Sequence, residues 1–534
     1  MTNTNGSAFI GTTLALPSFE DEFGFNDMGT AELSNTKQNI VSLYQAGAFF
    51  GSFFAYVSAY FLGRKQSLML FSLVFILGAG MMLGATGDRG LGLILGGRVL
   101  AGIGVGAASM ITPIYISEIS PPAVRGRLVG IYELGWQVGG LVGFWINYGI
   151  EQTLPSNHSQ WLIPFAVQLI PAGLLLIGAF WIRESPRWLM SKHRREKAIQ
   201  NLCWIRNLPA DDIYIVEEVA SLDLVLEEQA AAIGEGFWKP FQAAGRDRKV
   251  MWRLFLGCML FMWQNGSGIN AINYYSPRVF ASIGIRGTST SFLTTGIFGV
   301  VKTVFTVVWI LILIDHLGRR KLLMIGAAGG SVCMWIIGAY ILRAGVDPES
   351  DAPLSSGGIA AVFFFYLWTV FYTPSWNGTP WVINSEIFDN NTRGLGQASA
   401  AASNWFWVSY QLFLHKSKSE LTRTNNKHQN FLISRFTSTM FDRMGPSGCG
   451  VYFFFASMMI LSIFFVFFLI PETKSIPLES MDRLFAAKPT WQANKIILDE
   501  DRARDEEFRH DTDVDLTKEK QGTHTETAAR ADSS

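Results

Sequence analysis

Ten long apolar stretches constrain what this chain can fold into more than any other feature of its sequence. Each is close to the ~20 residues that an α-helix needs to cross a lipid bilayer. Only 16% of the residues are charged, whereas a soluble domain carries about 25%. We therefore expect an all-α integral membrane protein. The stretches are residues 39–62, 68–86, 91–116, 128–148, 161–182, 254–272, 293–314, 322–342, 359–383 and 451–470.

Two further segments are apolar but incomplete as crossings. Residues 7–16 reach only half of the required length, and residues 394–407 begin a helix that runs into a charged stretch. Completing both would bring the number of crossings to twelve. The expected fold is thus two six-helix bundles, with helix 1 truncated and helix 11 interrupted in this chain.

A charged signature, Ser-Glu-Ile followed by Arg-Gly, occurs twice, each time directly after a long apolar stretch. Two looser pairs of marks recur in the same order. The matched residues are Glu118 with Glu386, Arg125 with Arg393, Arg64 with Arg319, and Glu184 with Glu472. Three paired marks in one order are hard to obtain by chance, so they indicate a duplicated bundle with pseudo-two-fold symmetry. Parallel repeats of this kind occur in two-half transporters.

The repeat suggests where the domains begin and end. We expect an N-terminal bundle, a linker of short amphipathic helices, a C-terminal bundle and a largely disordered tail, at residues 7–182, 183–250, 251–471 and 472–534. Most Lys and Arg residues of the short loops, including Arg64 and Arg319, fall at one end of the bundles, which is therefore expected to be cytoplasmic. The linker and the tail share that side. Both chain ends lie there if helix 1 is complete.

The sequence lacks the residue patterns of several functional classes. The formal net charge is +0, which gives no electrostatic reason to expect nucleic acid as a partner. The 4 cysteines and 7 histidines follow neither a disulfide framework nor a metal-binding spacing. The sequence has no Gly-rich phosphate loop and no nucleophile elbow. We therefore expect no metal, no cofactor and no enzymatic activity.

Five motifs resemble those of one transporter family. They are Gly-Arg at 97–98 with glycines at 102, 104 and 106, Pro-Ile-Tyr-Ile-Ser-Glu at 113–118, Arg-Glu-Ser-Pro-Arg-Trp at 183–188, Gln-Asn-Gly-Ser-Gly-Ile-Asn at 264–270 and Pro-Glu-Thr-Lys at 471–474. On these motifs the chain resembles the sugar porters of the major facilitator superfamily over residues 7–485. Segments 7–17, 143–147 and 450–456 are more similar still to the fungal quinate permeases. The resemblance implies two six-helix bundles that rock around a substrate site at the membrane midplane.

Lys302 lies in an apolar span, where an unpaired cation costs about 2.5–3.5 kcal/mol on insertion scales. It must therefore face either a cavity or an acidic partner on another helix. Sugar porters usually carry Asn at this position. Hydrogen bonds to charged groups are about twice as strong as neutral ones, so an ammonium here favours an anionic polyol such as quinate over a neutral hexose.

Glu133 occupies the position at which sugar porters typically carry a substrate-binding Gln. Gln137 lies one helical turn away on the same face. Two roles for Glu133 remain open from the sequence. Either it pairs with Lys302 across the empty cavity until a substrate carboxylate displaces it, or it carries a proton.

The resemblance implies five further substrate-binding residues. They are Gln264, Asn265, Asn270, Trp381 and Asn404. Amide and indole groups suit a ring that bears many hydroxyls, because they offer fixed donors and acceptors and an aromatic face. The alternative for each of them is a hydrogen bond between helices. Tyr274 and Tyr275, just after an expected helix break at Asn270, correspond to the outer gate of the family, with core packing as the alternative.

In this family, Arg and Glu residues at the cytoplasmic ends of the bundles form ion-pair networks that close the inner gate. The matching residues are Arg64, Glu118, Arg125 and Glu184 in the first half, and Arg319, Glu386, Arg393 and Glu472 in the second. Exposed ion pairs contribute only about 0–1 kcal/mol each, which suits networks that break and reform. The alternative is that these residues only set the topology. Tyr60 stands where the family pattern has an acid, so the sequence does not establish the first network.

Arg98 corresponds to the arginine that, in proton-coupled members of the family, partners an Asp in helix 1. That Asp would directly precede Ser7, where this sequence has Gly6. We therefore expect Arg98 to be an uncompensated intramembrane charge, unless an upstream coding segment supplies the acid and the first half of helix 1. A uniporter that does without the acid is the alternative.

Residues 408–429 interrupt the family pattern of helix 11. The segment carries several charged residues, among them Lys416, Glu420 and Arg423, which a lipid-facing span cannot accommodate. We expect it to loop out of the helix or to break the helix, and we interpret it as translated intron sequence.

The sequence therefore predicts a multi-pass plasma-membrane transporter that imports quinate or a related cyclic polyol or sugar acid by alternating access, with protons as co-substrate. The expected partners are this substrate, protons and the lipid bilayer, and a monomer is expected. A carrier of neutral hexoses or pentoses is the nearest alternative. A nutrient sensor that binds substrate without moving it is an alternative of another class, which the short tail argues against.

Overall fold

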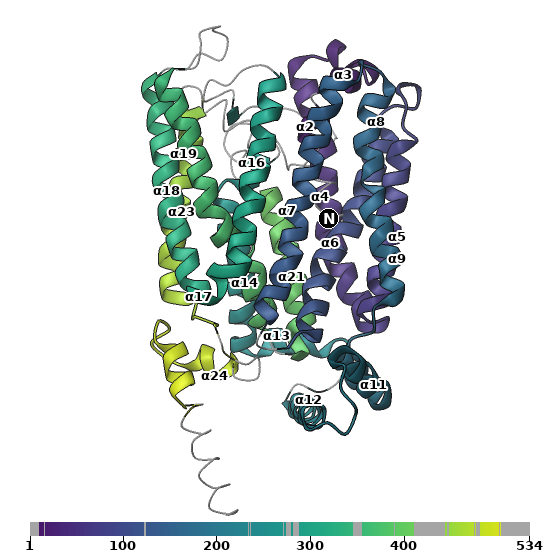
Figure 1. Ribbon diagram of the computed structural model, residues 1–534, viewed down its shortest axis with the longest axis vertical. Helices are drawn as coiled ribbons and strands as arrows, with labels where there is room; N and C mark the ends of the chain where they lie inside the picture. The colour runs from purple at the N-terminus through teal and green to yellow at the C-terminus, as the bar shows by residue number, and fades with distance from the viewer. Residues whose placement is uncertain are drawn as a thin grey trace, which may run out of the picture.

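The computed structural model of the chain describes residues 10–14, 16–121, 124–232, 234, 236–270, 272–273, 279–280, 288–344, 355–388, 390–410, 444–445, 448–474, 476, 481–500 and 502. Within these residues the regular elements are all helices. Figure 1 shows long helices that stand side by side in two groups, with short helices gathered below them. The expectation of an all-α membrane protein is confirmed.

The first half of the chain forms one group. Its elements are α2 (Ile10–Thr13), α3 (Pro17–Glu22), η1 (Phe25–Asp27), α4 (Thr30–Phe61), α5 (Arg64–Leu83), η2 (Gly87–Arg89), α6 (Gly92–Ile119), α7 (Arg125–Thr153), α8 (His158–Val167) and α9 (Leu169–Trp181). Helix α6 packs against both α4 and α5, and α8 and α9 cover α5. Within the incomplete crossing expected at residues 7–16, the described helix is α2.

The second half forms the other group. Its elements are α14 (Arg248–Gly266), α16 (Thr288–Val308), η3 (Trp309–Leu313), α17 (Ile314–His316), α18 (Arg319–Ala344), α19 (Ser356–Tyr372), η4 (Thr373–Asn377), α20 (Thr379–Glu386), α21 (Asn390–Tyr410) and α23 (Cys449–Leu469). Helix α18 packs against α19 and α23, and α14 packs against α21. The most extensive contacts between the halves are those of α7 along α16 and of α4 along α21.

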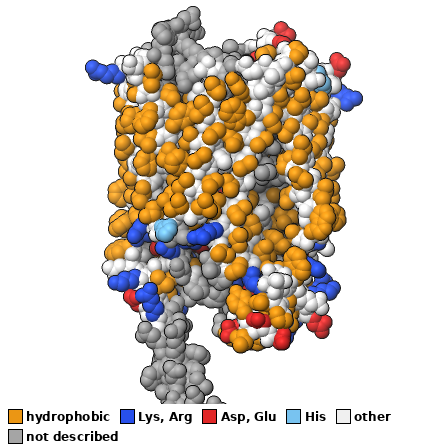
Figure 2. Space-filling model, viewed as in Figure 1, with side chains coloured by type: hydrophobic (Ala, Val, Ile, Leu, Met, Phe, Trp, Pro, Cys, Tyr) orange, Lys and Arg blue, Asp and Glu red, His pale blue; other side chains and the backbone are white. Residues whose placement is uncertain are grey.

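Short helices gather at one end of the bundles (Figure 1, lower end). They are α10 (Pro186–Ser191), α11 (Arg195–Arg206), α12 (Ile213–Ala232), α13 (Lys239–Arg246) and α24 (Met481–Ala486). This end also carries Arg64 and Arg319, which begin α5 and α18, and it is called the Arg-rich end below. Figure 2 shows a broad hydrophobic belt across this face of the bundles and clusters of Lys and Arg below it. The belt fits a surface that faces lipid.

Eight described helical segments are long and apolar enough to cross a membrane. They correspond to eight of the ten expected crossings. Helices α7 and α14 cover the other two with 29 and 19 residues, and they are less apolar than these eight segments. The reason is the buried polar side chains that these two helices carry, such as Glu133 and Gln137 on α7 and Gln264 on α14.

Glycines allow α4 and α6 to pack closely. A Cβ at Gly102 would lie 2.1 Å from the carbonyl oxygen of Tyr44, and a Cβ at Gly106 would lie 1.9 Å from that of Ala48. Only glycine fits where two backbones approach this closely, as at many contacts between transmembrane helices. Packing between α4 and α6 thus explains the glycines that follow Arg98 in the sequence.

Two helices are irregular where they border the space between the halves. Helix α14 ends at Gly266, and Gly268 has a φ of +90°, a conformation that glycine adopts most easily. The break expected at Asn270 therefore lies earlier in the chain. Helix α19 passes into the π-helical turn η4, which contains Pro374. Proline lacks the N–H of a regular helical hydrogen bond, and π-helical turns are frequent at functional sites.

Some expectations fall outside the described residues. Helix α21 continues to Tyr410, but most of the interrupting segment 408–429 is not described. The same holds for Tyr274 and Tyr275 and for residues 1–9. The expected outer gate, the start of helix 1 and the interruption of helix 11 therefore stay predictions.

Candidate functional site

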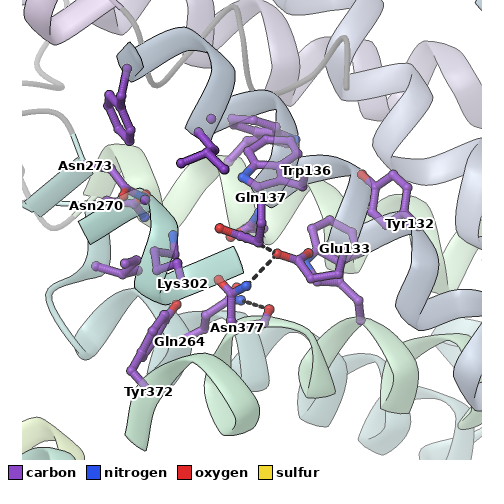
Figure 3. A pocket seen from close by; sticks show the side chains of 18 residues that line it. Tyr132, Glu133, Trp136, Gln137, Gln264, Asn270, Asn273, Lys302, Tyr372 and Asn377 are labelled. Atoms are coloured by element: carbon purple, nitrogen blue, oxygen red, sulfur yellow. Dashed lines mark hydrogen bonds between the residues drawn. The ribbon is translucent and has the colours of Figure 1, made fainter. Parts of the chain in front are cut away.

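A cavity of about 80 Å³ lies between the two halves of the chain (Figure 3). Its walls come from α7 in the first half and mainly from α14, α16, α19, η4, α20 and α21 in the second. A space of this size holds several water molecules, because one water needs about 10–15 Å³. A polar cavity at the contact between two bundles is a natural position for a small ligand.

Seven of the eight predicted substrate-binding residues line this cavity. They are Glu133, Gln137, Gln264, Asn270, Lys302, Trp381 and Asn404. Sequence positions up to 271 residues apart thus meet at one place, as the repeat of a two-half transporter leads one to expect. Their role in binding stays a prediction.

Asn265, the eighth predicted residue, lies behind the cavity wall. Its side-chain nitrogen donates to the carbonyl oxygen of Phe261 at 2.7 Å and to Asn404 Oδ1 at 3.0 Å. Its Oδ1 accepts a hydrogen bond from the side chain of Asn270. Since Asn404 and Asn270 both line the cavity, Asn265 holds two lining side chains in place.

Glu133 is buried and holds together residues from both halves. Its Oε1 accepts a hydrogen bond from Gln137 Nε2 on the next turn of α7 at 2.5 Å. The same oxygen accepts from Asn377 Nδ2 at 2.6 Å, and Asn377 belongs to η4 in the second half. Two amide donors on one carboxylate oxygen fix the orientation of the carboxyl group.

Lys302 projects into the cavity from α16 (Figure 3). Its side chain is 5% exposed, and its ammonium lies 5.5 Å from the centre of the Phe298 ring. Glu133 and Lys302 influence each other electrostatically, but the structure records no direct ion pair between these two described residues. Among the described residues, no hydrogen-bond acceptor is recorded for the ammonium. The direct pairing that the sequence left open is therefore not what the structure has.

Several cavity residues were not anticipated from the sequence. They are Tyr132, Trp136, Asn273, Tyr372, Asn377 and Trp405. For Asn377 a signal existed, because Pro374 and Pro380 flank it within an apolar stretch, and two prolines there indicate an irregular helix. Two carbonyl oxygens of this irregular turn accept hydrogen bonds from Gln264 Nε2, that of Trp376 at 2.9 Å and that of Asn377 at 2.7 Å.

Arg64 lies between two glutamates at the Arg-rich end. Its Nη2 donates to Glu118 Oε1 at 2.7 Å, and its backbone N–H donates to Glu184 Oε1 at 2.9 Å. The N–H groups of Lys65 and Ser185 also donate to Glu184. Burial raises the pKa of Glu184, and these hydrogen bonds oppose that rise.

The second half repeats this arrangement. Arg319 Nη2 lies 3.2 Å from Glu386 Oε1, and the backbone N–H of Arg319 donates to Glu472 Oε1 at 2.9 Å. The remaining carboxylate oxygen of Glu386 accepts from the Thr473 hydroxyl at 2.8 Å. Both arginines also reach a carbonyl oxygen five residues back, on Ala59 and Ile314 respectively.

Positive φ angles explain the glycine before each of these arginines. Gly63 and Gly318 have φ of +92° and +81°. A Cβ on either would lie 2.5 Å from a carboxylate oxygen, of Glu184 and Glu472 respectively. Glycine is therefore needed for two independent reasons, the backbone conformation and the close carboxylate.

The other two predicted network arginines are also buried at this end. Arg125 Nε donates to the carbonyl oxygen of Ser117 at 3.2 Å, and Arg393 Nη2 donates to that of Phe388 at 3.3 Å. In the first half, Tyr60 occupies the position of the acid in the family pattern. The centre of its ring lies 3.6 Å from the Lys192 ammonium. A stacked cation of this kind is attracted by the ring face.

Arg98 is fully buried in the first half. Its guanidinium lies 4.2 Å from the centre of the Tyr44 ring, and its Nε donates to the carbonyl oxygen of Ile40 at 3.1 Å. An aromatic face and a carbonyl oxygen thus stabilise the cation, and the absence of an acid partner in helix 1 stays a prediction because residues 1–9 lie outside the described part of the chain. The Tyr44 ring in turn contacts Trp405, which lines the cavity.

Comparison with known proteins places the chain in a family. The family described as "Sugar (and other) transporter" matches residues 6–415 and 414–485. A probable quinate permease of Aspergillus flavus is 64% identical over 505 residues, which cover 95% of this chain and 89% of that protein. A probable quinate permease of Aspergillus clavatus is 65% identical over the same shares.

Solved structures show the same fold. The proton:xylose symporter XylE of the major facilitator superfamily, bound to 6-bromo-6-deoxy-D-glucose, superimposes with a TM-score of 0.72 at 26% identity, over 91% of this chain and 98% of that one. The inward-open form of XylE from E. coli gives a TM-score of 0.61 at 24% identity, over 90% and 98%. Its two-bundle architecture agrees with the arrangement described above. The chain therefore belongs to the sugar transporter family of the major facilitator superfamily.

Proposed function

We propose that this protein imports quinate, or a related cyclic polyol acid, across the plasma membrane by alternating access and together with protons. The observation that carries this proposal is the ammonium of Lys302. It lines the cavity, it is 5% exposed, and no hydrogen-bond acceptor is recorded for it among the described residues. A buried ammonium needs hydrogen-bond acceptors, and a substrate carboxylate supplies a charged one.

The remaining lining residues suit the hydroxyl-bearing ring of such a substrate. Gln137, Gln264, Asn270 and Asn404 present amide groups around the cavity, and each amide can both donate and accept. Trp381 adds an aromatic face, which covers the apolar side of a ring. The amides favour polyols in general, whereas Lys302 favours the acidic ones.

Contacts between the halves support an inner gate that is shut at the Arg-rich end. A Cβ on Gly126 of α7 would lie 2.7 Å from Arg319 Nη2, and one on Gly130 would lie 3.0 Å from Ile310 of η3. The ion pairs of Arg64 and Arg319 hold the helix ends on either side of this contact. We infer that they break when the bundles rock and the cavity opens toward the cytoplasm.

Relatives support both the substrate and the proton. The fungal relatives are named probable quinate permeases, and XylE is a proton:xylose symporter. XylE also favours a second candidate, a neutral hexose or pentose as substrate. Lys302 argues against it, because a neutral sugar offers the buried ammonium only neutral hydrogen-bond acceptors, whereas a carboxylate accepts a stronger, charge-assisted hydrogen bond.

Uptake into proteoliposomes tests the proposal. Purified protein is reconstituted and given labelled quinate or labelled xylose, each with and without an inward proton gradient. Quinate uptake that the gradient stimulates, together with little xylose uptake, is the expected result. Equal uptake of both substrates would favour the neutral-sugar carrier, and binding of quinate without any uptake would favour a sensor.

A further inference from the structure

Glu133 faces the same cavity as Lys302, and the pair gives that cavity a particular charge balance. We propose that Glu133 carries the coupled proton, so that one substrate carboxylate and one proton cross together without net movement of charge. This inference rests on the function proposed above. It places the proton on α7, beside the substrate.

The charge of the cavity supports a stoichiometry of one to one. Among the described lining residues, Glu133 supplies one negative charge and Lys302 one positive charge, so the empty cavity is neutral. A bound carboxylate alone would leave it with a net charge of minus one, which is unfavourable inside a membrane. A proton on Glu133 restores neutrality.

The hydrogen bonds of Glu133 leave one oxygen available for that proton. Oε1 accepts from Gln137 Nε2 and Asn377 Nδ2, while no partner is recorded for Oε2 among the described residues. A protonated carboxyl keeps one oxygen as an acceptor and carries the proton on the other. Both amide bonds can therefore persist when the proton binds Oε2, where it can be donated to a substrate oxygen.

The charged and titratable groups around this carboxyl are compatible with the exchange. Lys302 on α16, which packs against α7, and Tyr372 on α19 line the same cavity as Glu133. On α6, Arg98 stacks on Tyr44 instead. Among the described lining residues, Lys302 is therefore the cation that the substrate carboxylate and Glu133 share.

The sequence of events follows from this sharing. With substrate bound, Lys302 pairs with the substrate carboxylate, and Glu133 takes up a proton from the outside. When the substrate leaves to the inside, Lys302 becomes the counter-charge of Glu133 again, and the proton leaves Oε2 for cytoplasmic water. Substrate and proton thus move in the same direction, and each full cycle returns the cavity to neutrality.

Proteoliposomes of the wild-type protein test the stoichiometry. Labelled quinate uptake is followed together with the internal pH, using a trapped pH-sensitive dye, while potassium and valinomycin set the membrane potential. We expect internal acidification with uptake, a rate that does not respond to the potential, and about tenfold accumulation for each unit of pH difference. Uptake that an inside-negative potential accelerates strongly, or that acidifies nothing, overturns the proposal.

The variant Glu133→Gln tests the position of the proton. It keeps the two amide contacts possible but cannot be protonated and deprotonated. We expect the variant to exchange labelled for unlabelled quinate while it neither accumulates quinate along a pH gradient nor moves protons. A folded variant that still couples quinate to protons, or one that has lost exchange as well, contradicts the role assigned to Glu133.

Two controls separate this inference from the function on which it rests. If the wild-type protein does not transport quinate at all, the proposed function fails rather than the position of the proton. If Glu133→Gln does not fold, two other measurements test whether Glu133 carries the proton. They are the voltage dependence of the wild-type protein and the coupling of the conservative variant Glu133→Asp. The Asp variant is expected to retain proton-coupled uptake, and its loss of coupling at unchanged exchange would overturn the charge-balance argument.

Discussion

Asn377 and Glu133 are joined by a hydrogen bond of 2.6 Å although 244 positions separate them in the sequence. Asn377 belongs to the π-helical turn η4 of the second half, and Glu133 belongs to α7 of the first. The bond therefore links the two halves at the wall of the cavity. Any motion that separates η4 from α7 has to break it.

The first prediction concerns this link. Asn377→Ala removes one of the two donors to Glu133 Oε1, and a hydrogen bond to a charged group contributes about 1.5–3 kcal/mol. We expect quinate uptake to fall by roughly 10–100-fold at equal amounts of protein in the membrane. Asn377→Asp should be more severe, because it places a second carboxylate against Glu133. An Asp variant as active as the wild type would contradict the bond's role.

The second prediction concerns substrate charge. Lys302→Asn removes the ammonium and restores the residue usual in sugar porters, so affinity for quinate should fall by about 10–100-fold, the equivalent of one lost charge-assisted hydrogen bond. Competition by the uncharged methyl ester of quinate should fall much less. Both are measured as inhibition of labelled uptake.

A matched substitution controls this experiment. Lys321 is exposed at the start of α18, so Lys321→Asn makes the same chemical change away from the cavity. We expect its quinate affinity to remain that of the wild type. If Lys302→Asn kept the wild-type affinity for quinate, Lys302 would not be the residue that binds the substrate carboxylate.

The third prediction concerns the glycine before Arg319. Gly318→Ala adds a Cβ at φ of +81° and 2.5 Å from a carboxylate oxygen of Glu472. A left-handed conformation alone costs an alanine about 1–2 kcal/mol, and the clash adds to it. We expect a lower melting temperature in detergent, measured by the fluorescence of a thiol-reactive or tryptophan probe.

Gly90 provides the control for this substitution. Its φ is +65°, and a Cβ there would meet nothing within 4 Å. Gly90→Ala therefore has the backbone strain without the clash. We expect a clearly smaller shift in melting temperature than for Gly318→Ala. Equal shifts would mean that the carboxylate contact of Glu472 contributes nothing.

The fourth prediction concerns the ion pair between Arg319 and Glu386. Their side chains are 7% and 8% exposed, and breaking a buried pair by removing one partner costs about 3–5 kcal/mol. Arg319→Ala should therefore weaken the closed state at the Arg-rich end. We expect faster labelling of a cysteine placed in the cavity by a thiol reagent added from that end.

An exposed pair supplies the comparison. Arg195 and Asp223 lie 2.9 Å apart but are 61% and 36% exposed, and such pairs contribute only about 0–1 kcal/mol. Arg195→Ala should leave the labelling rate unchanged. If both variants behave alike, the ion pair of Arg319 does not hold the inner gate.

Local patterns in the sequence were sufficient for the architecture. Apolar runs of membrane-spanning length predict helices because a backbone in lipid must satisfy its own hydrogen bonds. Arg64 and Arg319 could be paired from the repeat alone, because each follows a glycine and matches an acid in the same order. Helices α7 and α14 are less apolar than the other spans, because they carry polar residues of the cavity.

Contacts between distant residues needed the tertiary structure. Asn377 gave only the indirect signal of its flanking prolines, since a π-helical turn depends on how the chain packs around it. Asn265 looked like a binding residue but supports Asn404 and Asn270 from behind, a distinction that depends on which face of α14 meets α21.

The sequence by itself determined that this chain is a duplicated membrane bundle with Lys302 and Glu133 inside its apolar spans. Burying a charge in lipid is so unfavourable that their presence alone indicated a functional cavity. Only the tertiary structure decided how the two are arranged. The packing of α7 against α16 and η4 gives Glu133 two amide donors and leaves Lys302 facing the cavity without a direct ion pair to it. The separation of Glu133 and Lys302 depends on how closely α7 and α16 pack, and no local sequence pattern encodes this packing.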